Sequence, residues 1–184
     1  MFFALDVAVA IALPFSLFAL HRRRSLPRCV WPLYWLGVAI GLSWELGYHF
    51  TGPLYSDTPS YLQATPYPFH PLAQPFMHAL WDGGLFVAGL APLWWLCAPP
   101  RLQGFSWREL AILVTWGQQQ ELCVDLVAQA TGAWSFTPSW WNPVLFEFGE
   151  GAITLAPQLI WLVAPCVFYA GALALNRRLG PDPA

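Results

Sequence analysis

The run Trp116-Gly-Gln-Gln-Gln-Glu-Leu-Cys-Val-Asp125 places amides and carboxylates inside a stretch that otherwise has the composition of a membrane-spanning helix. Gln118, Glu121 and Asp125 recur at spacings of three and four residues, so on a helix they share one face. An ionisable side chain in a bilayer is costly and marks a functional site by default. The alternative is a polar seam that only holds helices together. The run therefore predicts a membrane helix with one polar face.

The composition of the whole chain is that of an integral membrane protein. Of its 184 residues, 57% are hydrophobic and only 10% are charged, whereas a soluble domain carries about 25% charged residues. A spanning helix needs about 20 apolar residues. We therefore expect an all-α fold, a bundle of five transmembrane helices that forms a single transmembrane domain over residues 1–184. The expected spans are Phe2 to Leu20, Cys29 to Phe50, Pro75 to Leu96, Leu110 to Ala130 and Ile153 to Leu175.

The basic residues predict an orientation. All of them are Arg, and they fall in three clusters over 22–28, 101–108 and 177–178. The positive-inside rule makes these clusters cytoplasmic, so we expect the N-terminus outside, the C-terminus cytoplasmic, and the loops 51–75 and 131–152 outside. The clusters are expected to contact anionic lipid head groups, and they are too short to indicate nucleic acid. The oligomeric state stays open, a homodimer included.

Metal binding and disulfides are not indicated. The four Cys residues have no CxxC spacing, which argues against a disulfide framework and against a zinc site. His78 and Asp82 lie four residues apart, but the chain lacks the HExxH and ExxH patterns of helical metal sites. We therefore expect no metal and no other cofactor.

Three acidic residues outside the central helices are expected in water. Asp6 lies near the outer end of the first helix, where we expect a solvated terminus. Glu147 and Glu150 come shortly before the last helix, whose N-terminus favours negative charge. The loop 51–74 is rich in Pro, Tyr and Ser, so we expect it to form a lid or to lie at the head-group level.

Polar residues of four expected helices fall at one depth. The second and fourth helices run outward and the third and fifth run inward, so late residues of the former lie level with early residues of the latter. Burial disfavours the charged form of a carboxyl group, so we expect some of these acids to be protonated and able to act as general acids. The candidate catalytic residues are Glu45, Asp82, Glu121, Asp125 and His78. The candidate substrate-binding residues are Trp44, Tyr48, His49, Trp81, Gln118, Gln158, Trp161 and Asn142.

Buried acids beside aromatic rings suit one type of reaction. A carboxylic acid protonates a carbon–carbon double bond, aromatic faces stabilise the carbocation, and a second base removes a proton elsewhere. Exclusion of water prevents capture of the cation. The substrate of such a site is apolar and dissolved in the membrane, which points to an isoprenoid or a sterol.

The last helix resembles that of a known family. Gln158-Leu-Ile-Trp161-Leu-Val-Ala-Pro165 is similar to the Asn-x-x-Trp-Leu-Val-x-Pro motif of emopamil-binding protein, the sterol double-bond isomerase of the EXPERA superfamily. Gly117-Gln118 with an acid shortly after resembles the preceding helix of that family. The resemblance implies a five-helix plan and acids on the second and third helices, for which Glu45 and Asp82 are the nearest matches. The chain departs from the pattern at Gln158, which replaces Asn.

The second helix departs from the EXPERA pattern and adds a second resemblance. The family has His four residues before its Glu, where this chain has Gly41, and here His49 follows Glu45 instead. Trp44-Glu45-Leu-Gly-Tyr48 resembles the Trp-Glu-x-x-Tyr helix of small integral-membrane terpene cyclases, in which the Glu is part of the acid that starts cyclisation. Both resemblances imply acid-initiated chemistry.

We therefore expect an integral-membrane isomerase or terpene cyclase that uses an acid–base mechanism and no cofactor. Its substrate would be an isoprenoid or sterol lipid, either cyclised or moved to a new double-bond position. The alternative is a non-enzymatic sterol- or lipid-binding membrane protein, in which the acids serve as counter-ions of a ligand. A third reading is a structural subunit of a larger membrane complex.

Overall fold

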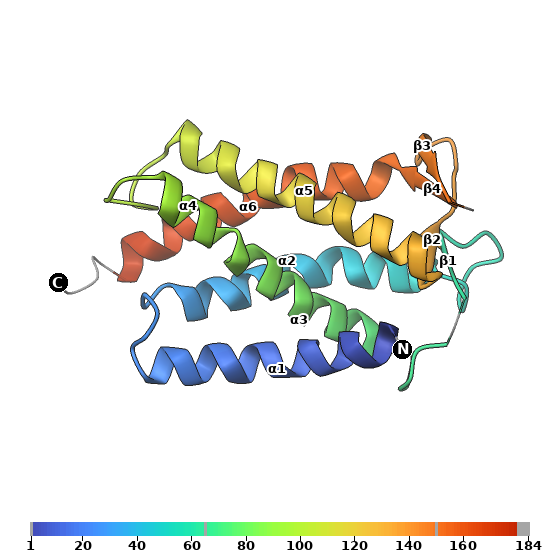
Figure 1. The fold of residues 1–184 in the computed structure, drawn as a ribbon, viewed down its shortest axis with the longest axis horizontal. Helices are drawn as coiled ribbons and strands as arrows, with labels where there is room; N and C mark the ends of the chain where they lie inside the picture. The colour runs from blue at the N-terminus through green and yellow to red at the C-terminus, as the bar shows by residue number, and fades with distance from the viewer. Residues whose placement is uncertain (1, 65, 150, 180–184) are drawn as a thin grey trace.

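A computed structural model describes residues 2–64, 66–149 and 151–179, and it shows an elongated, mostly helical molecule (Figure 1). The helices are α1 (Phe2–Arg22), α2 (Val30–Thr51), α3 (Ala73–Ala88), α4 (Leu90–Leu96), α5 (Trp107–Thr131) and α6 (Leu155–Leu179). Gly89 alone separates α3 from α4, and its helical backbone keeps the two in one rod (φ −63°, ψ −18°). The helices begin and end within a few residues of the predicted spans.

Three helices are long and apolar enough to cross a membrane. They are Phe3–Arg22, the α3–α4 rod Ala73–Leu96, and Leu155–Leu179. Helices α2 and α5 form where they were predicted, but within the described residues only those three meet the criteria of length and composition. In α5 the amides and carboxylates of 116–125 lower the hydropathy. The chain therefore has the character of a membrane protein. Its hydropathy supports three membrane-spanning helices and does not by itself support the five that were predicted.

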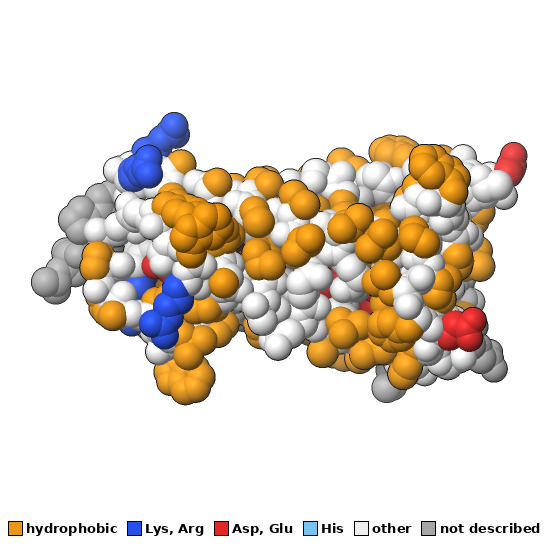
Figure 2. Space-filling view, turned by 90° about the horizontal axis from the view of Figure 1, so that it is seen from above, with side chains coloured by type: hydrophobic (Ala, Val, Ile, Leu, Met, Phe, Trp, Pro, Cys, Tyr) orange, Lys and Arg blue, Asp and Glu red, His pale blue; other side chains and the backbone are white. Residues whose placement is uncertain are grey.

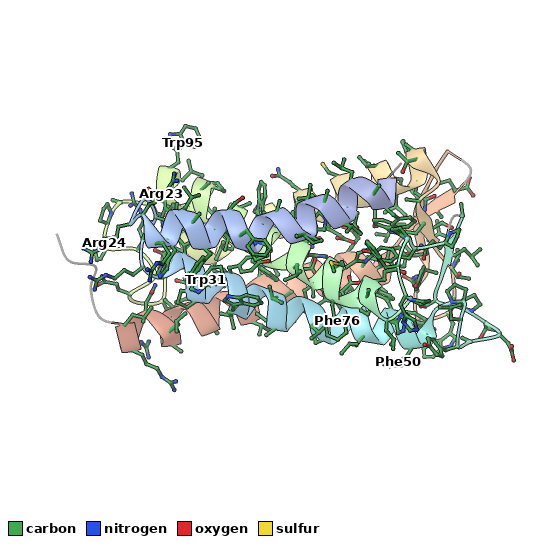
Figure 3. The ribbon with its side chains drawn as sticks, turned by 90° about the horizontal axis from the view of Figure 1, so that it is seen from below. Arg23, Arg24, Trp31, Phe50, Phe76 and Trp95 are labelled. Atoms are coloured by element: carbon green, nitrogen blue, oxygen red, sulfur yellow. The ribbon has the colours of Figure 1, made fainter. Side chains whose placement is uncertain are left out.

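The two ends of the bundle differ in charge. The loops 23–29 and 97–106 and the end of α6 lie at one end, called here the Arg end, and the strands lie at the other, called the strand end (Figure 1). Every Arg except the half-buried Arg101 is exposed. Figure 2 shows Arg side chains (blue) at one end and exposed acidic side chains (red) at the other, with hydrophobic side chains between them. Figure 3 shows Arg23, Arg24 and Trp95 projecting at the Arg end.

The loops at the strand end form two small sheets, which the all-α prediction did not include. The strands are β1 (Tyr61–Gln63), β2 (Trp134–Phe136), β3 (Val144–Phe148) and β4 (Gly151–Thr154). β1 pairs with β2 in antiparallel fashion, and β3 pairs with β4. The first sheet ties the loop after α2 to the loop after α5, a pairing between distant segments that local sequence does not encode. Glu147 is exposed in β3, as expected, and Glu150 lies outside the described residues.

One buried acid has a structural role at the Arg end. Glu109 lies in the first turn of α5, and its carboxylate accepts hydrogen bonds from the backbone N–H of Leu102 at 3.0 Å and from the Tyr169 hydroxyl at 2.8 Å. Ser106 caps the same helix by accepting from the Glu109 N–H at 3.4 Å. Since a buried polar group is costly without partners, these bonds explain how this acid is tolerated.

Small residues let α2 and α3 approach closely. A Cβ placed on Gly83 would lie 2.9 Å from the Tyr34 carbonyl oxygen and 2.5 Å from a Val38 methyl group. A Cβ on Gly37 would lie 3.0 Å from the Gly83 Cα. Close backbone approach at small residues is a common way for helices to associate in membranes. This contact fixes the relative position of the two helices that carry Glu45 and Asp82.

Replacing Gly83 by Ala is expected to lower the free energy of unfolding by about 1–3 kcal/mol, the usual cost of overpacking a close contact. Thermal unfolding of the purified protein in one detergent measures it. The matched control is Gly47→Ala in α2, where a Cβ meets nothing within 4 Å and Ala favours the helix by about 1 kcal/mol. Equal melting temperatures for the two variants would contradict the close α2–α3 contact.

Candidate functional site

A pocket of about 360 Å³ lies in the half of the bundle near the strand end. Ligand pockets in proteins usually span about 300–1,000 Å³. Side chains of α1, α2, α3, α5 and α6 form its walls, and Tyr61, Trp134 and Phe136 come from β1 and β2. Most of the lining is apolar or aromatic. The ionisable side chains that line it, tyrosines and cysteine aside, are Asp6, Glu45, His49, His78, Asp82, Glu121 and Asp125.

The structure brings most of the predicted site residues to this pocket. The candidate catalytic residues that line it are Glu45, His78, Asp82, Glu121 and Asp125. The candidate substrate-binding residues that line it are Trp44, Tyr48, His49, Trp81 and Trp161. They meet because α2 and α5 end, and α3 and α6 begin, at the strand end. The remaining candidates are Gln118, Gln158 and Asn142, and they do not line the pocket.

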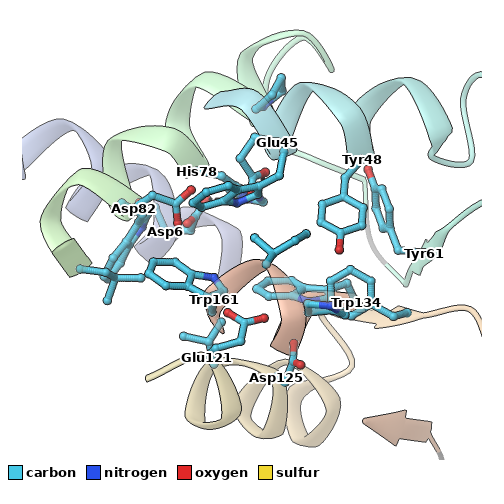
Figure 4. Close-up of a pocket in the computed structure, with 18 of the residues that line it drawn as sticks. Asp6, Glu45, Tyr48, Tyr61, His78, Asp82, Glu121, Asp125, Trp134 and Trp161 are labelled. Atoms are coloured by element: carbon cyan, nitrogen blue, oxygen red, sulfur yellow. Dashed lines mark hydrogen bonds and ion pairs between the residues drawn. The ribbon is translucent and has the colours of Figure 1, made fainter. Parts of the chain in front are cut away.

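One wall of the pocket is built by α1, α2 and α3. His78 Nδ1 lies 3.1 Å from Glu45 Oε2, and its Nε2 lies 3.5 Å from Asp6 Oδ2. Asp82 follows one turn later on α3, is buried, and packs on Gly41 of α2. Figure 4 shows these four side chains grouped together. Glycine at position 41 is required here, because any Cβ would collide with the Asp82 carboxyl group.

The opposite wall is built by α5 and α6. Glu121 and Asp125, both buried, project from α5 toward the first wall (Figure 4). Asp125 Oδ2 accepts a hydrogen bond from Gln158 Nε2 at 3.1 Å, and the Gln158 carbonyl oxygen accepts one from Gln118 Nε2 at 2.9 Å. Gln118 and Gln158 therefore lie behind the pocket wall and orient Asp125, which differs from the direct substrate contact predicted for them.

Asn142 has a structural position, although it was predicted to bind substrate. Its side chain is 1% exposed. Its Oδ1 accepts from the Ala156 N–H at 2.7 Å, and its Nδ2 donates to the Thr137 carbonyl oxygen at 3.3 Å. The first N–H groups of a helix lack partners within the helix, and Asn142 supplies one for α6.

Asp6 is a pocket residue that the sequence analysis missed. It was expected at a solvated terminus, but it is 8% exposed and contacts His78. That expectation was wrong because the loop before α3 covers this end of α1, where Tyr67 and Phe3 pack ring to ring. A usable signal was present, since Asp6 is the only acid in an otherwise apolar helix.

Aromatic rings surround the space between the two walls. Trp161 is buried, and its ring centroid lies 5.5 Å from that of Trp44 and 5.0 Å from that of Phe86. Toward the strand end, Tyr48 lies 5.1 Å from Phe136 of β2. These rings exclude water and present π faces, which attract a positive charge.

The electrostatic character of the pocket is acidic. Five carboxyl groups line it, those of Asp6, Glu45, Asp82, Glu121 and Asp125, and no Lys or Arg is among the described residues of its wall. Asp82 Oδ2 is buried and finds no hydrogen-bond partner among the described residues. In an apolar setting an unpaired carboxylate is costly, and neutral carboxylic acids are favoured instead. The pocket is thus equipped to donate and accept protons.

Tyr61 lines the pocket from the loop after α2. Burial, and then the nearby Glu45 carboxylate, raise the pKa of its hydroxyl group, so it stays a hydrogen-bond donor.

Within the described part of the chain, no group of three or more His, Cys, Asp and Glu side chains is arranged to hold a metal ion.

Comparisons with protein-family models, curated proteins and solved structures returned no match for this chain. The chemistry of the pocket is therefore the basis for assigning a function.

Proposed function

We propose that this chain is an integral-membrane isomerase or terpene cyclase that acts on an isoprenoid or sterol lipid through proton-initiated carbocation chemistry, without a cofactor. The observation that carries the proposal is the pocket itself: an apolar, aromatic-lined space with five carboxyl groups and, among its described residues, no Lys or Arg. A general acid, a general base and cation-stabilising rings are the parts that such a reaction needs.

The reaction balances with protein groups alone. A neutral carboxylic acid on one wall gives its proton to a carbon of a double bond, and the partner carbon becomes a cation. A carboxylate on the facing wall then takes a proton from a neighbouring carbon, and the C–H electrons form the new double bond. In cyclisation a second double bond attacks the cation before that proton is lost. Atoms are conserved, and the protein ends with one proton moved from one wall to the other.

The two walls separate the acid from the base. Glu45 and Asp82 project from α2 and α3, and Glu121 and Asp125 project from α5, with Trp161 between them in Figure 4. A substrate lying between the walls would have a proton donor on one side and an acceptor on the other. The π face of Trp161 would stabilise the intervening cation, since Trp is the best of the aromatic side chains for this purpose.

The proposal includes a five-span arrangement in the membrane. The five helical rods contain 21 to 25 residues, and at about 1.5 Å per residue each is long enough for a hydrocarbon core of about 30 Å. The Arg end would be cytoplasmic, which leaves the pocket in the outer half of the bilayer. A lipid-dissolved substrate would then reach it without crossing water.

Kinship with the EXPERA superfamily is part of the same proposal. In support, the residues that carry the resemblances are close to the pocket: Trp44, Glu45 and Trp161 line it, and Gln158 bonds to Asp125. The rival function is non-enzymatic binding of a sterol or another lipid, for which the same pocket would serve as a ligand site.

The test is turnover in deuterated water. Purified protein in lipid nanodiscs is incubated in D₂O with squalene, with zymosterol, or with the lipids that copurify with it, and the lipids are analysed by mass spectrometry. Since carboxyl protons exchange with solvent, the product is expected to carry one deuterium at the protonated carbon. Nanodiscs without protein are the control. Unchanged lipids in all three incubations would overturn the enzyme and leave lipid binding as the function.

A further inference from the structure

His78 is held between two carboxyl groups that come from different helices. Its Nδ1 lies 3.1 Å from Glu45 Oε2 of α2, and its Nε2 lies 3.5 Å from Asp6 Oδ2 of α1. Both ring nitrogens of an imidazole are donors only when it is protonated. Here Nδ1 is hydrogen-bonded to Glu45 and Nε2 lies within ion-pair distance of Asp6. Two nearby carboxyl groups favour the charged form of the imidazole.

Two aromatic rings lie beside His78. Its ring centroid lies 6.0 Å from that of Tyr67, in an edge-to-face arrangement, and 6.0 Å from that of Trp134. The ionisable groups near the imidazole are Asp6 from α1, Glu45 from α2, Asp82 one turn away on α3, and Tyr67 from the preceding loop. None of the four is cationic.

Asp6 is itself fixed by two separate elements. The Tyr67 hydroxyl donates to Asp6 Oδ2 at 3.2 Å, and the Trp81 indole N–H donates to the Asp6 carbonyl oxygen at 2.9 Å. Burial, and then the Asp6 carboxylate, raise the pKa of the Tyr67 hydroxyl, so this donor is kept. The first helix is thus bound to the pocket by bonds that set where the Asp6 carboxylate points.

We infer that Asp6 is a positioning residue: it holds His78 as an imidazolium whose Nδ1–H is directed at Glu45. Glu45, paired with this cation at 3.1 Å, is the proton acceptor of the pocket. Glu121 is buried on the facing wall and lines the pocket, and it is the proton donor. The assignment of donor and acceptor rests on the proposed function, whereas the charge state of His78 does not.

The charge state of His78 can be measured without any substrate. Nitrogen-15 NMR of histidine-labelled protein in nanodiscs separates imidazolium from neutral imidazole, and His78→Asn identifies the signal. At neutral pH the wild-type His78 is expected to be protonated on both nitrogens. Asp6→Asn is expected to convert it to the neutral ring, and Asp6→Glu to restore the imidazolium. Asp57→Asn, the same change at an exposed acid, is expected to leave the signal unchanged.

Two results would overturn the inference. One is a neutral His78 in the wild-type protein, and the other is an unchanged imidazolium in a folded Asp6→Asn variant. Far-ultraviolet circular dichroism and melting temperature establish folding. If Asp6→Asn does not fold, the Asp6→Glu variant is the test instead. A neutral His78 in folded Asp6→Glu would equally contradict a role for the negative charge at position 6.

Turnover then tests the link to chemistry. Asp6→Asn is expected to lower kcat about tenfold, because the Asp6–His78 ion pair is lost, with KM unchanged. If His78 behaves as expected but the wild-type protein turns over no lipid, the proposed function fails and the placement of Asp6 stands.

Discussion

Replacing Glu121 by Gln is expected to lower turnover by about 100- to 10,000-fold, the usual contribution of a general acid. Gln keeps the size of the side chain and its capacity to accept hydrogen bonds, but it has no acidic proton to give. Glu121 is 7% exposed and faces the acids of α2 and α3 across the pocket. The measurement is the rate of deuterium incorporation into the lipid product in D₂O.

The matched control for Glu121 is Glu147→Gln. Glu147 is exposed in β3 and does not line the pocket, so the same chemical change there is expected to leave the rate within a factor of two of wild type. Binding of the lipid substrate, measured by the amount retained on repurified nanodiscs, is expected to survive in both variants. Full turnover by Glu121→Gln would rule out Glu121 as the proton donor.

The helices could be predicted from the sequence, because apolar stretches of spanning length are a local property. The strands could not. Tyr61 of β1 lies opposite Phe136 of β2 across 75 residues of chain, and nothing in either short segment specifies the other. Their pairing nevertheless brings Tyr61 and Phe136 together in the lining of the pocket, so part of the site depends on the least predictable part of the fold.

The walls of the pocket could be predicted by combining depth with chemistry. Glu45, Asp82 and Glu121 are costly in a bilayer. Successive helices run in opposite directions, which puts these three residues at one depth, and this was enough to predict that they share a site. Asp6 was missed because its burial depends on the loop that carries Tyr67. Asn142 was misassigned for a related reason, since its role in capping α6 arises from a loop path that the sequence does not show.

The acids and the aromatic core depend on one another. Trp161 contacts Trp44, which precedes Glu45 on α2, and Phe86, which lies one turn after Asp82 on α3. Gly117, one turn before Glu121, packs on the Trp161 backbone and on Pro165. Trp161 therefore contacts α2, α3 and α5, which carry four of the five acids of the pocket, and it fixes the spacing of the two walls.

Replacing Trp161 by Phe is expected to lower turnover about tenfold while the protein stays folded. Phe keeps a ring in the core but offers a weaker π face to a cation. A desolvated cation–π contact contributes about 2 kcal/mol. Trp161→Ala is expected to lower the free energy of unfolding by about 3–5 kcal/mol, because the ring is 4% exposed. Trp140→Phe is the control, since Trp140 is 94% exposed and is expected to change neither quantity. Rates and melting temperatures are measured on the same nanodisc samples. If Trp161 only packs the core, the rate of Trp161→Phe is expected to fall only as far as its melting temperature falls. If Trp161 stabilises the cation, the rate is expected to fall while the melting temperature stays nearly unchanged.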